Sequence, residues 1–401
     1  MQFGREQEQA LSAVGDWLKD PSEQLFRLFG FAGTGKTTLA RYLSQDVSGR
    51  VIFSAFTGKA TYVLKQKGCP NATTIHKLIY LPKDKSKRRL IELEADLQVA
   101  QAEGDLVLVK ELSEAIRLEK KNLERPMFQL NFESELAGAK LLVVDECSMV
   151  DERMAEDLLS FDTKILVLGD PAQLPPVKGT GYFTDADPDF MLTEIHRQAK
   201  GDPIIDLATK IRKGQLPDYG TYGDSRVIHP AEFKRLDLAM EADQILVGKN
   251  DTRKAFNRRM RERLGFEGEL PVEGDRLVCL KNNHENGLLN GSIWTVEDSH
   301  EDEDFEDRLN LVLKTEDGEG QIATDAHSHH FIGKELPYWD RKEADEFDYG
   351  YALTCHKSQG SQWDRVAVWD ESAVFRQDRW RWLYTAVTRA AKQVDLVVRD
   401  A

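Results

Sequence analysis

Short, continuous apolar runs alternate with amphipathic stretches along most of this chain. The apolar runs predict buried strands, and the segments in question are 25–29, 50–60, 139–151, 163–177, 243–250, 365–370 and 393–400. Uninterrupted apolar strands are typical of parallel sheets that are covered on both faces. Apolar residues recur with helical spacing at 2–19, 38–45 and 202–214. Strands that alternate with helices predict doubly wound α/β domains, with ligands at the carboxyl ends of the strands.

Two regions depart from this pattern. Residues 82–125 are rich in Glu, Lys, Leu and Ala, with helical leucine spacing on both sides of Gly104, and they predict an inserted helical hairpin. From residue 274 the apolar residues alternate with period two, interrupted by Asn-Gly pairs, which predicts a small antiparallel β-barrel or meander. We therefore expect four units along the chain. They are a first α/β domain at 1–81 and 126–184, its helical insertion at 82–125, a second α/β domain at 185–273 and 346–401, and a β-barrel insertion at 274–345.

Composition narrows the class of protein. The chain has 401 residues, 41% of them hydrophobic and 31% charged, which is ordinary for a soluble protein. The charged N-terminal segment does not resemble a signal peptide, no apolar run is long enough to cross a membrane, and four scattered cysteines favour reduced thiols. We expect a cytoplasmic protein. A net charge of −15 argues against bulk electrostatic binding of nucleic acid but permits a local basic groove. The basic runs at 83–89 and 253–263 are predicted to be solvated faces.

The segment 30–38, GFAGTGKTT, fits a phosphate-binding loop between a strand and a helix. Its central glycines let backbone amides close around phosphate oxygens, while the lysine contacts the β- and γ-phosphates and the first threonine ligates Mg²⁺. The residues concerned are Gly33, Thr34, Gly35, Lys36, Thr37 and Thr38. This loop predicts a nucleoside triphosphate site.

Two further strand ends carry chemistry that suits such a site. Asp145 and Glu146 follow a buried strand, where Asp145 can hold Mg²⁺ and Glu146 can orient or deprotonate the attacking water. Gln173 lies in the proline-rich loop GDPAQLPP, where it can sense the γ-phosphate. The phosphate loop and the acidic pair together predict a hydrolase of nucleoside triphosphates, without indicating what the energy is used for.

Two other features remain ambiguous. Gln7 precedes the phosphate loop and could meet an adenine edge, but its spacing alone favours a helix-surface glutamine. The cluster His327, His329 and His330 could suggest a metal site. Because no cysteine or carboxylate completes a convincing ligand set in the sequence, we expect an exposed loop there.

Taken in order, the motifs resemble those of the superfamily 1 helicases, in the group of RecD and Dda, which move 5′→3′ on single-stranded DNA. The segments that carry the resemblance are FGREQEQAL, GFAGTGKTT, SAFTGKA, TTIH, VVDECSM, GDPAQLPPV, EIHRQ, YALTCHKSQGSQWD and LYTAVTRA. The resemblance implies two RecA-like domains, an accessory barrel similar to a Src-homology-3 domain, and ATP and Mg²⁺ as cofactors. Residues 82–125 match no motif, but they occupy the position where this group inserts a strand-separating element.

The resemblance also assigns residues. It implies that Gln7 contacts adenine, that Gln359 and Gly360 contribute to the nucleotide site, and that Arg197 and Arg389 are arginine fingers; from charge alone, either arginine could equally form a surface ion pair. Contacts to DNA phosphates are implied for Thr57, Lys59, Thr74, His76, Thr354, His356 and Ser358. The expected partners are single-stranded DNA, forked or tailed duplex DNA and a single-strand-binding protein, and the expected state is a monomer.

Two alternative functions stay open at this point. Superfamily 1 motifs also serve RNA translocases, and the same site could power a nucleic-acid clamp or remodelling ATPase that does not unwind. No nuclease constellation is visible in the sequence, so we expect no strand cleavage.

Overall fold

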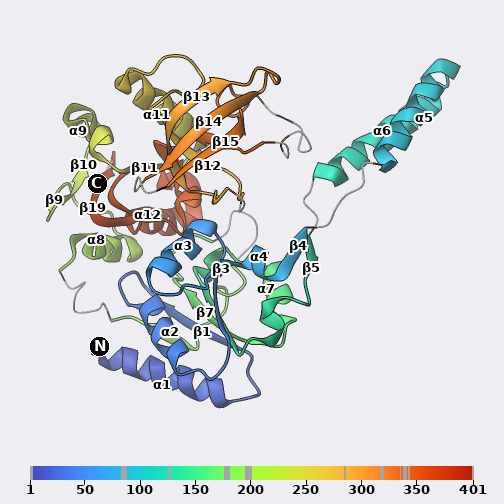
Figure 1. The fold of residues 1–401 in the computed structure, drawn as a ribbon. Helices are drawn as coiled ribbons and strands as arrows, with labels where there is room; N and C mark the ends of the chain where they lie inside the picture. The colour runs from blue at the N-terminus through green and yellow to red at the C-terminus, as the bar shows by residue number, and fades with distance from the viewer. Residues whose placement is uncertain are drawn as a thin grey trace.

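Two lobes and two inserted elements make up the computed structural model, which describes residues 3–82, 88–124, 128–175, 181–194, 201–283, 286–316, 320–334, 336, 341 and 344–399. In Figure 1 the first lobe (blue to green) lies below the second lobe (yellow to red). A third sheet (orange) lies beside the second lobe, and a pair of helices (cyan) extends away from the body.

The first lobe is built on a six-stranded parallel sheet with the strand order β3-β2-β6-β7-β1-β8. Alternate residues of β6 point to opposite faces, so that Leu141 and Val143 pack on one side while Leu142 and Val144 pack on the other. The predicted covering of both faces is confirmed. The strands are β1 (Leu25–Gly30), β2 (Val51–Ala55), β3 (Thr73–Thr74), β6 (Leu141–Asp145), β7 (Lys164–Gly169) and β8 (Phe190–Leu192). The helices are α1 (Arg5–Lys19), α2 (Lys36–Gln45), α3 (Gly58–Gln66), α4 (Ile75–Ile79) and α7 (Glu152–Leu159).

The second lobe repeats this plan with the strand order β17-β11-β18-β19-β10-β9, in which only the pairing of β10 with β9 is antiparallel. Helices α8 (Pro203–Arg212) and α12 (Arg379–Val387) contribute to the core on one face, and α9 (Pro230–Leu236), α10 (Leu238–Glu241) and α11 (Asn250–Leu264) contribute to the core on the other. The strands are β9 (Gly220–Tyr222), β10 (Ser225–Ile228), β11 (Gln244–Val247), β17 (Ala352–Thr354), β18 (Trp363–Trp369) and β19 (Ala390–Val397).

The third sheet is antiparallel, has the order β15-β14-β13-β12-β16, and shares its apolar core with the second lobe. Two buried ion pairs reinforce this junction: Arg261 Nε lies 2.9 Å from Asp275 Oδ1, and Arg253 Nη1 lies 2.6 Å from Asp348 Oδ2. The basic run at 253–263 is therefore not simply a solvated face, because each of these two arginines is only 5% exposed. The strands are β12 (Arg276–Cys279), β13 (Ile293–Glu301), β14 (Arg308–Thr315), β15 (Gln321–His327) and β16 (Phe347–Tyr349).

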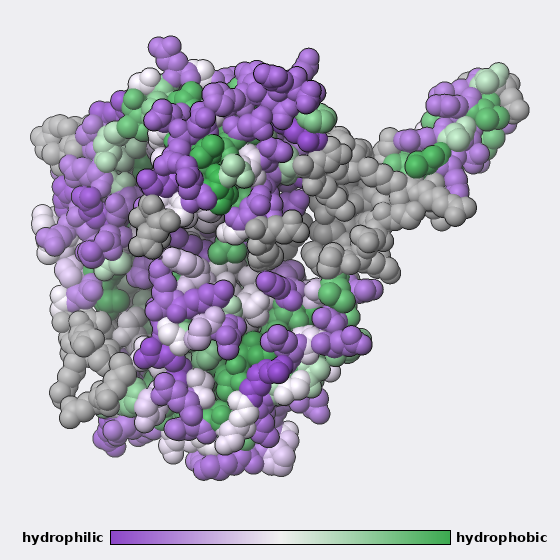
Figure 2. Space-filling model, in the orientation of Figure 1, coloured by the Kyte–Doolittle hydropathy of each residue, from purple (hydrophilic) through white to green (hydrophobic). Residues whose placement is uncertain are grey.

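Helices α5 (Arg88–Glu103) and α6 (Leu106–Glu124) form the predicted hairpin, which projects from the first lobe as an arm (Figure 1). The turn between them uses Gly104 at φ 73°, a left-handed conformation that favours glycine. A small core centred on Leu90 and Ile116 joins the two helices. Exposed apolar side chains are interspersed with charged ones along the arm (Figure 2). At the base of the arm, β4 (Tyr80–Pro82) pairs with β5 (Phe128–Leu130).

Two short strands lie beyond the boundaries that the sequence suggested. β8 pairs with β1, so residues 190–192 extend the first sheet past the expected end at 184. β16 pairs with β12, so residues 347–349 belong to the third sheet rather than to the second α/β domain. Both strands have only three residues, too few for a periodic pattern, and strand pairing is set by distant parts of the chain.

The remaining composition-based expectations concern thiols and membranes. All four cysteines are free, as the sequence predicted, and all four are buried. Within the described part of the chain, none of the helices has the length and apolar character needed to cross a bilayer.

Candidate nucleotide site and inter-lobe cleft

The phosphate loop joins β1 to the N-terminus of α2. Gly33 and Gly35 have φ values of 80° and 85°, so both adopt the left-handed conformation that the tight turn requires. A Cβ atom on Gly35 would lie 2.9 Å from Gln7 Nε2, which shows how closely the loop is packed. Lys36 Nζ donates to the carbonyl oxygen of Gly30 at 2.6 Å. The loop thus presents backbone amides and a lysine at a helix N-terminus, which is an arrangement that binds anions.

Two carboxylates face this loop from the end of β6. Thr37 Oγ1 donates to Asp145 Oδ2 at 2.8 Å. Burial, followed by the neighbouring Glu146 carboxylate, raises the pKa of Asp145. Glu146 adopts a left-handed backbone conformation with φ 52°, which is unfavourable for a residue other than glycine and is typical of functional sites. Hydroxyl and carboxylate oxygens are the ligands that Mg²⁺ prefers, so Thr37 and Asp145 fit that ion.

A cavity of about 470 Å³ lies between the phosphate loop and the second lobe. It brings together most of the residues that the sequence suggested for the nucleotide, namely Gln7, Gly33, Gly35, Lys36, Thr37, Thr38, Asp145, Glu146, Gln173, Gly360 and Arg389. Lys67, Ser361 and Gln362 also line it and were not anticipated. No motif marks Lys67, and Ser361 and Gln362 lie within the segment YALTCHKSQGSQWD without a role of their own. The side-chain oxygen of Gln173 is buried without a hydrogen-bond partner among the described residues.

Three of the predicted nucleotide residues are not among those that line the cavity. Thr34 is fully buried and its hydroxyl donates to the carbonyl oxygen of Phe31, so its side chain supports the loop from within. Gln359 is 3% exposed and its Nε2 donates to the carbonyl oxygen of Leu174, which makes it a contact between lobes. Arg197 lies outside the described residues.

Gln7 is not the surface residue that its spacing favoured. It is 7% exposed and lines the cavity, and its Nε2 donates to the carbonyl oxygen of Thr34 at 3.1 Å. Its Oε1 accepts a hydrogen bond from the backbone N–H of Gly4. The side chain is therefore held against the phosphate loop, a long-range contact that helical spacing alone does not reveal.

The candidate DNA contacts of the first lobe lie at the N-termini of two helices. Thr57 and Thr74 cap α3 and α4, and their hydroxyl oxygens accept from the backbone N–H groups of Ala60 and Lys77. Lys59 Nζ lies 3.8 Å from a carboxylate oxygen of Glu316, which follows β14 of the third sheet. The ring of His76 contacts the rings of Phe56 and Tyr80.

In the second lobe, Thr354 and His356 lie at the end of β17. Burial lowers the pKa values of His356 and His76, so both imidazoles are neutral at pH 7 and can offer hydrogen bonds but no charge. Ser358 differs from expectation, because it is fully buried and its hydroxyl donates to the carbonyl oxygen of Cys355 at 2.7 Å. This geometry gives no support for a phosphate contact by Ser358.

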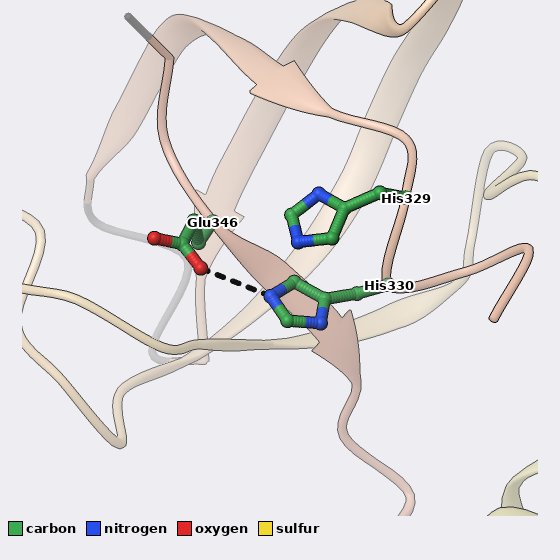
Figure 3. Close-up of side chains that lie close together, drawn as sticks. All are labelled: His329, His330 and Glu346. Atoms are coloured by element: carbon green, nitrogen blue, oxygen red, sulfur yellow. Dashed lines mark hydrogen bonds and ion pairs between the residues drawn. The ribbon is translucent and has the colours of Figure 1, made fainter. Parts of the chain in front are cut away.

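Two of the three histidines in the cluster are buried and the third, His330, is partly buried, contrary to the expectation of an exposed loop. His327 and His329 are 1% and 3% exposed, and His330 Nε2 lies 3.0 Å from Glu346 Oε2 (Figure 3). Glu346, distant in sequence, supplies the carboxylate that was missing from the pattern. The same oxygen accepts from Arg341 Nε at 3.0 Å, and a guanidinium in this position would repel a bound cation. We interpret the cluster as an ion-pair network around the buried carboxylate of Glu346 that supports the third sheet.

A larger hollow of about 750 Å³ lies on the third sheet. It is lined mainly by amide, carboxylate and small side chains between Lys281 and Asp345, and none of the motif residues line it. The chemistry therefore belongs to the smaller cavity at the phosphate loop.

The fold and this cavity define a class: P-loop proteins in which two RecA-like lobes face each other across a nucleotide site. A family model described as an AAA domain matches residues 2–232, and one described as a UvrD-like helicase C-terminal domain matches residues 349–397. The chain belongs to the superfamily 1 helicases, in the group of RecD and Dda.

Two curated relatives illustrate this membership. The chain is 29% identical over 287 residues to the ATP-dependent RecD2 DNA helicase of Deinococcus radiodurans, covering 64% of this chain and 36% of that protein. It is 27% identical over 201 residues to the ATP-dependent DNA helicase Dda of Enterobacteria phage T4, covering 46% of this chain and 37% of that protein. The chain thus matches only about a third of the length of these relatives.

Solved structures show the same fold. The Pif1 helicase from Bacteroides in complex with ADP-AlF3 and single-stranded DNA aligns with a TM-score of 0.52 and 18% identity, over 100% of this chain and 93% of that one. The Pif1 helicase from Candida albicans aligns with a TM-score of 0.51 and 20% identity, over 99% and 94% of the two chains.

Proposed function

We propose that this protein is an ATP-dependent DNA helicase that moves 5′→3′ along single-stranded DNA and unwinds duplexes. The observation that carries the proposal is the 470 Å³ cavity, in which Lys36, Glu146 and Gln173 of the first lobe meet Arg389 of the second. A site that is complete only when two lobes meet can couple hydrolysis to their relative movement. The curated relatives RecD2 and Dda, both named as DNA helicases, support the choice of DNA. The direction of movement is inferred from the group.

Each residue of the site has a chemical task in this proposal. Backbone amides of the phosphate loop and Lys36 bind phosphate oxygens, while Gln7 contacts adenine. Thr37 and Asp145 would hold Mg²⁺, which neutralises charge on the phosphates when bound. Glu146 orients the attacking water and takes its proton, Gln173 senses the γ-phosphate, and Arg389 stabilises the negative charge that develops during transfer.

The DNA track in this proposal crosses both lobes. In the first lobe, the phosphates of the strand are bound by Thr57, Lys59, Thr74 and His76. In the second lobe, they are bound by Thr354 and His356. Gly360 of the second lobe lies beside Thr57 of the first, since a Cβ atom on Gly360 would be 2.8 Å from Thr57 Oγ1. Because the two groups belong to different lobes, a change in lobe separation would alter the distance between them.

We further propose roles for the two inserted elements. The third sheet is an accessory domain similar to a Src-homology-3 barrel, and the arm is the strand-separating element. Charge on the arm indicates that its base is the part that approaches DNA, because phosphates repel an acidic tip. The distal residues 92–114 carry one lysine, Lys110, against the acidic residues Glu92, Glu94, Asp96, Glu103, Asp105, Glu111 and Glu114. A monomeric state and a single-strand-binding protein as partner stay predictions.

The decisive experiment is unwinding of forked duplexes that carry either a 5′ or a 3′ single-stranded tail. We expect ATP-dependent unwinding of the 5′-tailed substrate, and none by Lys36→Ala. Unwinding only from a 3′ tail would refute the direction, and wild-type activity in Lys36→Ala would refute the site. Matched DNA and RNA oligonucleotides in an ATPase assay separate a DNA motor from an RNA translocase. DNA-stimulated hydrolysis without unwinding would instead indicate a clamp or remodelling ATPase.

A further inference from the structure

One hydroxyl group of the second lobe bridges two parts of the first lobe's nucleotide site. The Tyr384 hydroxyl on α12 donates to Asp170 Oδ2 at 2.7 Å and accepts from the backbone N–H of Ala32 at 2.9 Å. Ala32 belongs to the phosphate loop, and Asp170 is the first residue after β7. Tyr384 is 2% exposed and Asp170 is 4% exposed, so neither can exchange its partner for water without a change in the interface between the lobes.

Two neighbouring contacts hold the loop that begins at Asp170 at a second point, Leu174. The backbone N–H of Leu174 donates to Thr385 Oγ1 at 2.9 Å, and Gln359 Nε2 donates to the carbonyl oxygen of Leu174 at 2.9 Å. The Leu174 side chain is 1% exposed and packs into the core of the second lobe. Gln173, which lines the nucleotide cavity, therefore lies in a loop that the second lobe fixes on both sides.

The same segment of the second lobe carries the arginine of the site. Arg389 follows the end of α12, is 5% exposed, and its Nε donates to the carbonyl oxygen of Thr385 at 3.1 Å. Because Tyr384 and Arg389 lie five residues apart at this helix end, the point at which Tyr384 docks determines where Arg389 stands relative to Lys36.

We propose that Tyr384 is a positioning residue for ATP hydrolysis. Its hydroxyl docks α12 on the phosphate loop and on the loop that contains Gln173, and so sets the distance between Arg389 and the nucleotide. This proposal rests on the proposed function. A hydrogen bond to a buried carboxylate is stronger and more directional than one between neutral groups, which suits it to fixing a geometry. The competing interpretation is a purely structural contact between the lobes.

The test compares Tyr384→Phe with Tyr351→Phe, a closely matched control. The Tyr351 hydroxyl also donates to a buried carboxylate, Asp275 Oδ1 at 2.9 Å, and accepts from a backbone N–H, that of Arg276 at 3.1 Å. Tyr351 is 7% exposed and makes these contacts outside the nucleotide cavity. Any effect that follows merely from losing a buried phenol hydroxyl should appear in both variants.

For Tyr384→Phe we expect kcat of DNA-stimulated hydrolysis to fall about tenfold, with KM for ATP nearly unchanged. Affinity for ADP with aluminium fluoride should fall by a similar factor while affinity for ADP alone holds, because only the former resembles the transition state. Tyr351→Phe should retain wild-type kcat. The proposal is overturned if kcat of Tyr384→Phe stays within twofold of wild type, or if both variants lose activity equally. A wild-type protein that fails to hydrolyse ATP would instead refute the proposed function, and this inference with it.

Discussion

Glu316 forms ion pairs with two basic side chains from different parts of the molecule. One of its carboxylate oxygens lies 3.8 Å from Lys59 Nζ of α3, and the other lies 2.5 Å from Arg276 Nη2 of β12. Lys59 is one of the proposed DNA contacts, so in this arrangement the carboxylate would compete with a DNA phosphate for the Lys59 ammonium group. We expect Glu316→Gln to strengthen binding of single-stranded DNA, because the substitution frees Lys59 for the backbone.

The size of the effect follows from distance and exposure. Two unit charges about 4 Å apart attract by ~1 kcal/mol in bulk water, and measured exposed pairs contribute ~0.2–1 kcal/mol. The side chains of Lys59 and Glu316 are 19% and 35% exposed, so the upper half of that range applies. A gain of about 0.5–1 kcal/mol corresponds to roughly two- to fivefold tighter binding. One additional phosphate contact should also steepen the dependence of log K on log salt by about 0.7.

The assay is fluorescence anisotropy with a labelled oligothymidine, measured over a series of salt concentrations. Glu297→Gln is the matched control, because Glu297 also belongs to the third sheet, lies 3.4 Å from Lys314 and has a side chain that is 34% exposed. Both variants remove one negative charge from the same sheet, but only Glu316→Gln frees Lys59. The reasoning fails if the two variants bind DNA equally well, or if Glu316→Gln improves binding to the same extent when Lys59 is replaced by Met.

Three further outcomes are expected. Glu146→Gln should bind ATP and DNA but not turn over, since an amide cannot take a proton from water; turnover close to wild type in a steady-state ATPase assay would remove Glu146 as the base. Replacing 88–124 with a short turn should reduce duplex unwinding far more than DNA-stimulated ATPase, and parallel loss of both rates would make the arm structural. Glu346→Gln should destabilise the protein at neutral pH. Burial alone would raise the pKa of Glu346, but hydrogen bonds from His330 and Arg341 lower it to about 2, against an ordinary value of 4.5. The resulting stabilisation, about 3 kcal/mol, is present above pH 4.5 and disappears as the pH falls toward 2. Urea unfolding should therefore separate wild type from Glu346→Gln at pH 7 and bring them together near pH 2, and equal stability at pH 7 would contradict this account.

The sequence pattern was sufficient to predict those elements whose structure depends on consecutive residues. The phosphate loop, the β6 strand before Asp145 and the helical arm each carry their signal within a few consecutive residues. Strand β8 could not be predicted, because three residues hold no period and the pairing with β1 joins distant segments. Burial of His329 depends on tertiary packing beside Glu346, and burial of Gln7 depends on contact with Thr34.

The residues of the candidate site also fall into two groups, those that a motif marks and those that only long-range contacts identify. Motif residues that are proposed to bind phosphate are recognisable because the chemistry restricts their type and spacing. Tyr384 was not singled out, because its importance comes from contacts with Ala32 and Asp170, which are remote in sequence. Lys67 enters the cavity from the end of α3 with no motif to mark it. Contacts between the lobes therefore could not be predicted from the sequence and become visible only in the structure.

The shared core of the third sheet and the second lobe has a mechanical consequence. Leu277 and Tyr349 of that sheet pack with Ile245 and Ala352 of the lobe, so the sheet cannot swing independently without exposing this core to water. It must turn with the second lobe as one body, so Glu316 moves with that lobe relative to α3. Separation of the lobes then stretches the Lys59–Glu316 ion pair, which joins α3 of the first lobe to the third sheet.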